Sequence, residues 1–182
     1  NESESVKKRF DIKISGIRYD KKYIFSEFGY NFLPSEISAT FALQQIKKLK
    51  NNIKIKIKNF KYLENFFKKY SNIVKLPKQN KNIKTGWLAF PLVLRKNNNI
   101  ERKKLQIFLE KKGIQTRTIF TGNILRQPIM KNKVFKKHQK SNIVSDDVMR
   151  NGILIGCHHG LKSSELQYMC EAFKKYFSRI KN

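Results

Sequence analysis

Apolar residues in the first third of the chain recur at spacings of three and four, which is the period of an amphipathic helix. One such stripe follows Pro34, and proline suits the first position of a helix. We expect the helix to run to about residue 50 and its stripe to pack onto the body of the protein. The stripe consists of Ala39, Ala42, Ile46 and Leu49.

Residues 53–70 support two interpretations. Ile53, Ile55 and Ile57 alternate with lysines, as they would in a half-buried strand. The alternation fails at Asn59, whereas helical spacing continues over about four turns. The longer match predicts a second helix over residues 53–70, with its lysines on a solvated face.

Shorter segments follow, in which strands alternate with helices, and this alternation favours a small α/β layer. Pro91 indicates a strand that lies at an edge or is interrupted, Gly113 marks a helix end, and Ser145 is placed to cap a helix. Residues 1–28 are expected to be largely irregular. The pattern predicts strands at 85–95, 114–120 and 153–157, a possible short strand at 11–17, helices at 99–113, 145–152 and 162–180, and loops at 76–84 and 121–142.

The composition is strongly basic: the 182-residue chain carries 40 Lys and Arg against 13 Asp and Glu, a formal net charge of +27. Such a charge attracts polyanions, so a basic nucleic-acid-binding protein is one alternative. The lysines are spread over nearly every segment, however, and no RNA- or DNA-binding signature accompanies them. We therefore expect no specific nucleic acid as a partner. No membrane is expected either, because the chain lacks a run of about 18 apolar residues.

Two cysteines and a histidine pair are the candidates for metal chemistry. Cys157 and Cys170 do not form a CxxC pair, so buried thiols in a reducing, cytoplasmic compartment are the simpler interpretation. His158 and His159 are adjacent on an extended segment, where neighbouring side chains point in opposite directions. We expect no metal site and assign no catalytic residue in this chain.

Four residues carry binding potential. Asn31 precedes the first helix, where its amide is either a simple turn residue or a donor aimed at a phosphate. Arg117 lies towards the end of a predicted strand, and Asn123 and Arg126 follow in the next loop. These three are either surface residues or a clamp for a phosphate or a sugar hydroxyl, because guanidinium is a good bidentate phosphate donor. The residues by themselves leave both alternatives open.

The chain contains, in this order, "GYNFLPSEISATFALQQIKKL" (29–49), "FLEKKGIQTRTIFTGN" (108–123) and "GCHHGLKSSELQYMCEAFKKYF" (156–177). These stretches resemble the DegT/DnrJ/StrS family of nucleotide-sugar enzymes, which use pyridoxal phosphate (PLP) on the type I aminotransferase fold. They look like the family's Gly-Tyr-Asn motif with its helix, the helix and strand of its small domain, and its final turn and helix. The family more often has a His-Pro pair where His158 and His159 stand.

The resemblance implies an α/β chain that forms the C-terminal part of the type I PLP-dependent aminotransferase fold. Residues 1–50 would be the end of the cofactor-binding large domain with a linking helix, and residues 51–182 the small α/β domain. In the family, the motif's asparagine reaches across a two-fold interface, so Asn31 would contact the phosphate of the neighbouring subunit's PLP in a homodimer. The expected contacts to a nucleotide-diphosphate sugar are Arg117, Asn123 and Arg126.

Two stretches, "TRTIFTGNILRQP" (116–128) and "KRF" (8–10), are similar to the branch that contains CDP-4-dehydro-6-deoxyglucose 3-dehydratase. Some members of that branch hold an iron–sulfur cluster through four cysteines. Val6 stands where one of these cysteines would fall, so no cluster is expected. The family's PLP-anchoring lysine, or the histidine that replaces it in this branch, lies N-terminal to the matched region. The isolated chain is therefore expected to be inactive, and the choice between dehydratase and aminotransferase stays open.

The expected function is that of the C-terminal portion of a PLP-dependent nucleotide-sugar 3-dehydratase or aminotransferase. Its pathway would be deoxysugar and lipopolysaccharide O-antigen biosynthesis, and its location the cytoplasm. The alternatives are a basic nucleic-acid-binding protein and a non-catalytic remnant of the enzyme.

Overall fold

The computed structural model describes residues 12–14, 16–19, 26–30, 32–96, 100–130 and 143–179. The chain separates into two compact units, Asn1–Gln44 and Gln45–Asn182. The domain boundary that the family resemblance implies, after residue 50, concerns a whole enzyme and stays a prediction. In the described ranges, no helix combines the length and the apolarity needed to cross a lipid bilayer.

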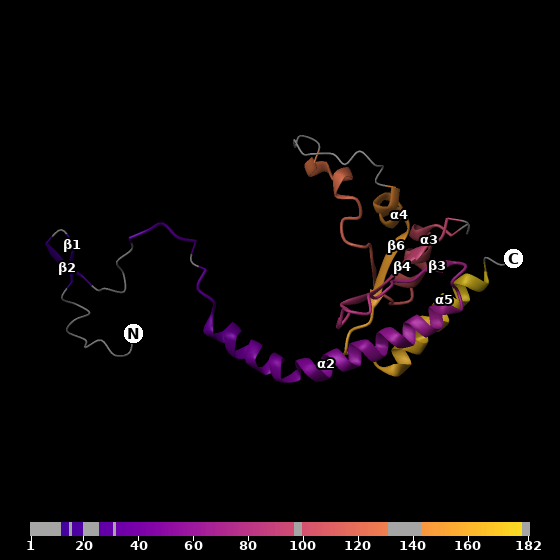
Figure 1. Ribbon diagram of the computed structural model, residues 1–182, viewed down its shortest axis with the longest axis horizontal. Coiled ribbons are helices and arrows are strands. Elements are labelled where there is room, and N and C mark those ends of the chain that lie inside the picture. The colour runs from indigo at the N-terminus through magenta and orange to yellow at the C-terminus, as the bar shows by residue number, and fades with distance from the viewer. Residues whose placement is uncertain are drawn as a thin grey trace. The chain divides into compact units, whose positions relative to one another are not determined.

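The first unit contains a two-stranded hairpin (Figure 1). Strands β1 (Ile12–Ile14) and β2 (Ile17–Tyr19) pair antiparallel, and Ile14 pairs with Ile17 beside the turn. Gly16 has a φ of 85°, a left-handed conformation that glycine adopts without the steric cost of a side chain. The possible short strand at 11–17 is therefore the first half of a hairpin.

Helix α2 (Glu36–Lys68) is one continuous helix, so the prediction of two helices is wrong (Figure 1). Asn51 and Asn52 lie between the two predicted segments and are only weak helix breakers, because neither fixes nor frees the backbone as Pro or Gly does. The choice of helix over strand for the isoleucine–lysine alternation is confirmed. Helical spacing, which persisted beyond the alternation, was the correct signal.

The two halves of α2 differ in burial. Its second half buries Phe60, Leu63 and Phe67. In the first half the stripe is exposed, and Ile46 and Leu49 are 63% and 52% exposed. The packing expected for this stripe is therefore absent from the part of the chain that the structure describes.

The second unit is built on a four-stranded sheet of order β3-β4-β6-β5, in which every neighbouring pair is antiparallel. Pro91 does not mark an edge strand, because β4 lies between β3 and β6. The very short β3 pairs only with Val93 and Leu94, so it does not extend along β4 as far as the proline. The strands are β3 (Val74–Lys75), β4 (Ala89–Leu94), β5 (Thr116–Arg117) and β6 (Gly152–Gly156).

Three further helices complete this unit. Gly113, at a φ of 71°, follows the end of α3 as predicted. Ser145 does not cap α4, because the helix begins two residues earlier at Ile143. The predicted loop at 121–142 contains two short 3-10 turns, and its residues 131–142 lie outside the described part. The helices are α3 (Arg102–Glu110), α4 (Ile143–Asn151) and α5 (Ser163–Ser178), and the 3-10 turns are η2 (Ile124–Arg126) and η3 (Pro128–Met130).

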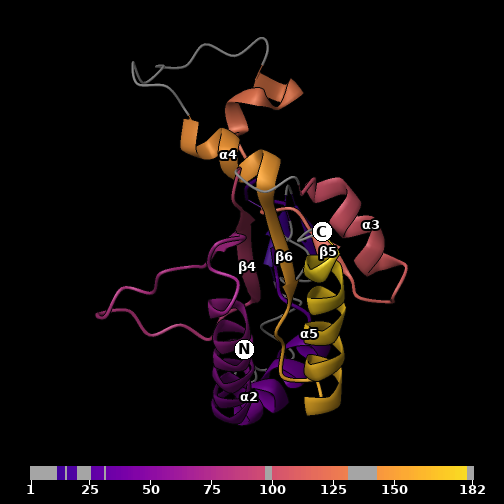
Figure 2. The same ribbon diagram turned by 90° about the vertical axis from the view of Figure 1, so that its right-hand side faces the viewer.

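The core forms between one face of the sheet and the helices α2 and α5, which lie side by side in Figures 1 and 2. Phe67 of α2 stacks on Phe90 of β4, with ring centroids 5.4 Å apart, and meets Phe173 of α5 edge-on at 4.9 Å. The buried amide of Asn59 donates a 2.9 Å hydrogen bond to the carbonyl of His158, which joins α2 to the turn before α5. This packing leaves the other sheet face available for a site.

Candidate ligand-binding site

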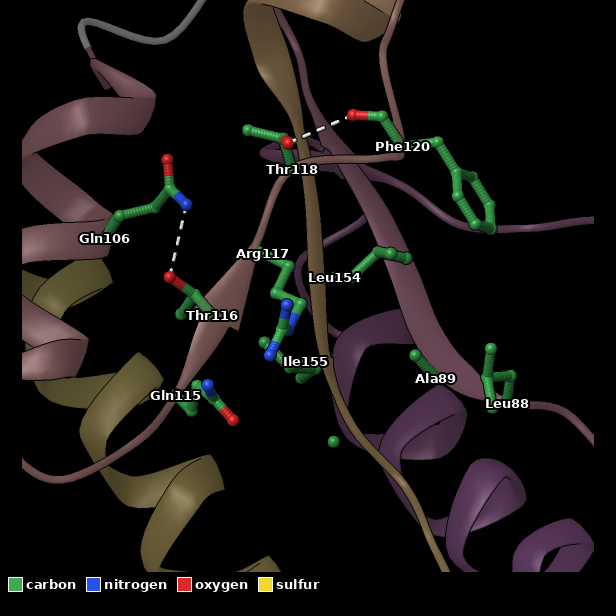
Figure 3. Close-up of a pocket in the computed structure, with 11 residues that line it drawn as sticks. Leu88, Ala89, Gln106, Gln115, Thr116, Arg117, Thr118, Phe120, Leu154 and Ile155 are labelled. Atoms are coloured by element: carbon green, nitrogen blue, oxygen red, sulfur yellow. Dashed lines mark hydrogen bonds between the residues drawn. The ribbon is translucent and has the colours of Figure 1, made fainter.

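A pocket of about 770 Å³ lies beside strands β5 and β6 (Figure 3). Strand register shows which of the nearby strand residues face away from the core. Phe90 and Ile155 are cross-strand partners on the core face, whereas Pro91, Leu154 and Arg117 are aligned on the opposite face, where none of them is fully buried. Most of the lining comes from Ala89 of β4, Gln106 of α3, Thr116 and Arg117 of β5, and Leu154 and Ile155 of β6.

Strand β5 is only two residues long and is held in place by helix α3. The carboxylate of Glu110 accepts hydrogen bonds from the Thr116 backbone amide at 2.6 Å and from its hydroxyl at 2.9 Å. Gln106 donates to the same hydroxyl at 3.1 Å, as the dashed line in Figure 3 marks. These contacts, together with pairing to β6, fix the strand that carries Arg117.

Arg117 is the one charged side chain among the described residues that line the pocket. It is exposed, and in Figure 3 it extends from β5 among the lining residues. It forms no side-chain hydrogen bond or ion pair with another described residue. A free guanidinium in a concave site suits a phosphate or a carboxylate, because its donors match two oxygens at once.

The wall of the pocket continues into the loop after β5. Phe120 lines the pocket and is 78% exposed, and it has a φ of 46°, which is unusual for a residue with a side chain. Its carbonyl accepts a 3.2 Å hydrogen bond from the hydroxyl of Thr118 (Figure 3). An exposed ring held in a costly backbone conformation is more common at functional sites than elsewhere.

Asn123 and Arg126 do not line this pocket; both bind the carboxylate of Asp146 on α4. Asn123 is buried and donates to Asp146 Oδ1 at 2.8 Å, and the Arg126 guanidinium binds both carboxylate oxygens. Hydrogen bonds from Arg126, and then from Asn123, lower the pKa of Asp146 below its usual value. The structure thus brings Asn123 and Arg126 together and places Arg117 apart from them, in the pocket.

The other sequence candidates are Asn31, the histidine pair and the two cysteines. Asn31 lies outside the described residues. The exposed His158 accepts a 3.2 Å hydrogen bond through Nδ1 from the amide of Gly160. Burial raises the pKa of Cys157 to about 11 and that of Cys170 to about 12, so both thiols stay protonated at neutral pH. No group of three potential metal ligands occurs in the described ranges.

Sequence reasoning missed three residues of this region: Glu110, Phe120 and Asp146. Glu110 and Phe120 lie within the stretch 108–123 that resembles the family, but no pattern marks their roles. Asp146 lies 20 residues beyond Arg126, so only the fold reveals the pair. We assign no step of a reaction on PLP to the described residues.

Solved structures of PLP-dependent sugar dehydratases and aminotransferases share this α/β arrangement. The E. coli GDP-4-keto-6-deoxy-D-mannose-3-dehydratase, solved with hydrated PLP, aligns with a TM-score of 0.72 and 28% identity over 83% of this chain and 38% of that one. A GDP-4-keto-6-deoxymannose-3-dehydratase variant with bound GDP-perosamine aligns with a TM-score of 0.70 and 27% identity over 84% of this chain and 39% of that one. The predicted α/β fold class is confirmed.

The model of the DegT/DnrJ/EryC1/StrS aminotransferase family matches residues 1–174, and the chain belongs to this family. A curated relative, the lipopolysaccharide biosynthesis protein RfbH of Salmonella typhimurium, is 28% identical over 93% of this chain and 39% of its own length. The chain thus spans about two-fifths of the length of the curated relatives it matches. The resemblance inferred from the motifs is confirmed.

Proposed function

We propose that the chain is the C-terminal part of a PLP-dependent nucleotide-sugar 3-dehydratase or aminotransferase. The enzyme would act in the cytoplasm in deoxysugar and lipopolysaccharide O-antigen biosynthesis. The main support is the family match over residues 1–174, together with the relatives that are 3-dehydratases. Family membership favours this enzyme over a nucleic-acid-binding protein, which rested on charge alone. Residues 1–50 would complete the large domain and residues 51–182 would form the small one.

The role of the pocket in this enzyme is to bind the nucleotide-diphosphate sugar. Arg117 supplies a positive charge and paired donors for the diphosphate or for sugar hydroxyls. Thr116 and Gln106 are already hydrogen-bonded to each other, so they set the shape of the pocket and keep Arg117 in place. Asn123 and Arg126 support the same site from the adjoining loop.

In the full-length enzyme, Arg117→Ala should raise KM for the nucleotide sugar, or its Kd, about tenfold or more while PLP binding is retained. This is the effect expected from losing a hydrogen bond to a charged group. The measurement is steady-state kinetics with CDP-, GDP- and dTDP-sugars, and the matched control is Arg95→Ala. Arg95 is also exposed, but its guanidinium donates a hydrogen bond to the backbone carbonyl of Ser71 outside the pocket. Unchanged kinetics in Arg117→Ala would reduce this residue to surface charge.

Asn31 is proposed to donate a hydrogen bond to the phosphate of the neighbouring subunit's PLP. In the full-length enzyme, Asn31→Ala should weaken PLP affinity by about 1–2 kcal/mol and loosen the homodimer with it, because the site is shared. PLP titration by absorbance, together with sedimentation, measures both effects. Asn51→Ala, an exposed position on α2, is the control. If the two variants bind PLP equally well, Asn31 has no such role.

A further inference from the structure

The loop that follows strand β5 is fastened to helix α4 through one carboxylate. Asp146 accepts the hydrogen bond of Asn123 and both hydrogen bonds of the Arg126 guanidinium. Asn123 is 5% exposed and the Asp146 side chain 14%, whereas Arg126 keeps 55% of its side chain accessible. The carboxylate and the amide are therefore largely removed from water, whereas the guanidinium stays exposed to it.

The backbone of the loop is fitted to α4 at the same place. Gly122 has a φ of 65° and lies so close to Met149 that an added Cβ would come within 2.5 Å of its Cγ. The Asn123 side chain also accepts a 3.1 Å hydrogen bond from the backbone amide of Leu125, and this bond caps the 3-10 turn η2. Gln127 donates back to the carbonyl of Thr121 at 2.9 Å. The segment 121–127 is thus closed on itself and held against the helix.

The pocket wall lies between two such attachments. Glu110 of α3 holds Thr116 at one end, and Asp146 of α4 holds Asn123 at the other. Arg117 and Phe120, which face the pocket, are in the short stretch between them. Phe120 has a left-handed backbone that costs free energy, and such a conformation persists only when its surroundings enforce it. If residues 117–120 were held at one end alone, Phe120 would leave its left-handed conformation.

We infer that Asp146 is the positioning residue of the pocket: by binding Asn123 and Arg126 it holds the 117–120 wall in the geometry that receives an anionic nucleotide ligand. Asn123 and Arg126 link the loop to Asp146, and Arg117 contacts the ligand directly. The ligand part of this inference rests on the proposed function. The mechanical part, that Asp146 orders the wall, stands on the contacts alone.

The first test measures amide hydrogen exchange in the isolated chain and needs no ligand. In Asp146→Ala, the amides of Gly122, Arg126 and Gln127 should exchange at least tenfold faster, while the β4–β6 ladder keeps its protection. These amides donate to carbonyls within the loop, so they report its local opening. Asp146→Glu, which keeps the charge, should restore part of the protection.

The matched control is Asp147→Ala. Asp147 is the next carboxylate on the same helix and is also paired, with Lys75 at 3.2 Å and Asn151 at 2.7 Å, but it forms no hydrogen bond or ion pair with the described loop residues 121–130. This variant should leave exchange in the loop unchanged. The inference is overturned if Asp146→Ala leaves the loop amides protected, or if Asp147→Ala exposes them to the same extent.

The second test titrates GDP and CDP into the same proteins by calorimetry. Asp146→Ala should weaken binding severalfold although Asp146 does not line the pocket, and Asp147→Ala should not. Full nucleotide affinity in Asp146→Ala, despite a loosened loop, would overturn the positioning role. If the unmodified chain binds neither nucleotide, the proposed pocket function fails for this chain, and the exchange experiment alone decides whether Asp146 orders the wall.

Discussion

Phe67→Ala should lower the free energy of unfolding by about 3–5 kcal/mol, the range for removing a large aromatic side chain from a packed core. Phe67 is fully buried and is the residue through which α2, β4 and α5 meet, because its ring contacts Phe90 at 5.4 Å and Phe173 at 4.9 Å. No small movement can refill the space, since its neighbours are themselves fixed by other aromatic contacts.

Urea denaturation followed by tryptophan fluorescence measures this effect. Trp87 is the chain's single tryptophan and stacks on Phe60 with centroids 4.0 Å apart, so its emission reports the integrity of the core. Phe41→Ala is the control, because Phe41 is on the same helix but is 66% exposed, and its loss should change stability by no more than about 0.5 kcal/mol. Equal effects of the two substitutions would contradict the burial of α2 described above.

Gly122→Ala should destabilise the second unit by about 2–5 kcal/mol, because two costs add. The first is the left-handed backbone at a φ of 65°, and the second is the collision with Met149, whose Cα would lie 2.9 Å from the new Cβ. A backbone atom cannot rotate away as the end of a side chain can. The loop must therefore move off α4, and the Asp146 contacts should weaken with it.

Gly113→Ala separates the two costs. Gly113 has a similar φ of 71°, but an added Cβ there would meet nothing within 4 Å. This variant should lose only about 1–2 kcal/mol, the penalty of the left-handed conformation. The difference between the two variants, measured by urea denaturation, isolates the contact with Met149. A difference near zero would mean that the loop does not pack on α4 in solution.

Sequence periodicity predicted the elements whose signal is local. The helix expected at 162–180 is α5 (Ser163–Ser178), and its apolar residues Leu166, Met169, Phe173 and Phe177 are all buried. Periodicity did not show that α2 is one continuous helix, because Asn51 and Asn52 resemble a loop between two helices although the helix continues through them. The strand was expected at 114–120, but β5 comprises only Thr116–Arg117. It pairs with β6 alone, and the chain then leaves the sheet for the loop.

In the candidate site too, the sequence predicted what depends on local signals and missed what depends on tertiary contacts. Arg117 was a candidate because of its residue type at the end of a strand, and the structure does put it in a pocket. The pairing of Arg126 with Asp146 on α4 depends on the tertiary structure, so no rule based on sequence spacing could predict it. Whether the loop residues also touch a ligand was not decidable from their chemistry, because donors that suit a phosphate suit an aspartate equally well.

The burial of both cysteines has a practical consequence for spectroscopy. Cys157 and Cys170 are the chain's two cysteines, and each is enclosed and protonated at neutral pH. Maleimide and methanethiosulfonate reagents need an accessible thiolate, so they should label neither native cysteine. A cysteine introduced at an exposed position such as Thr121 would take a spin label or fluorophore selectively, and the motion of the loop could be followed without first removing the native thiols.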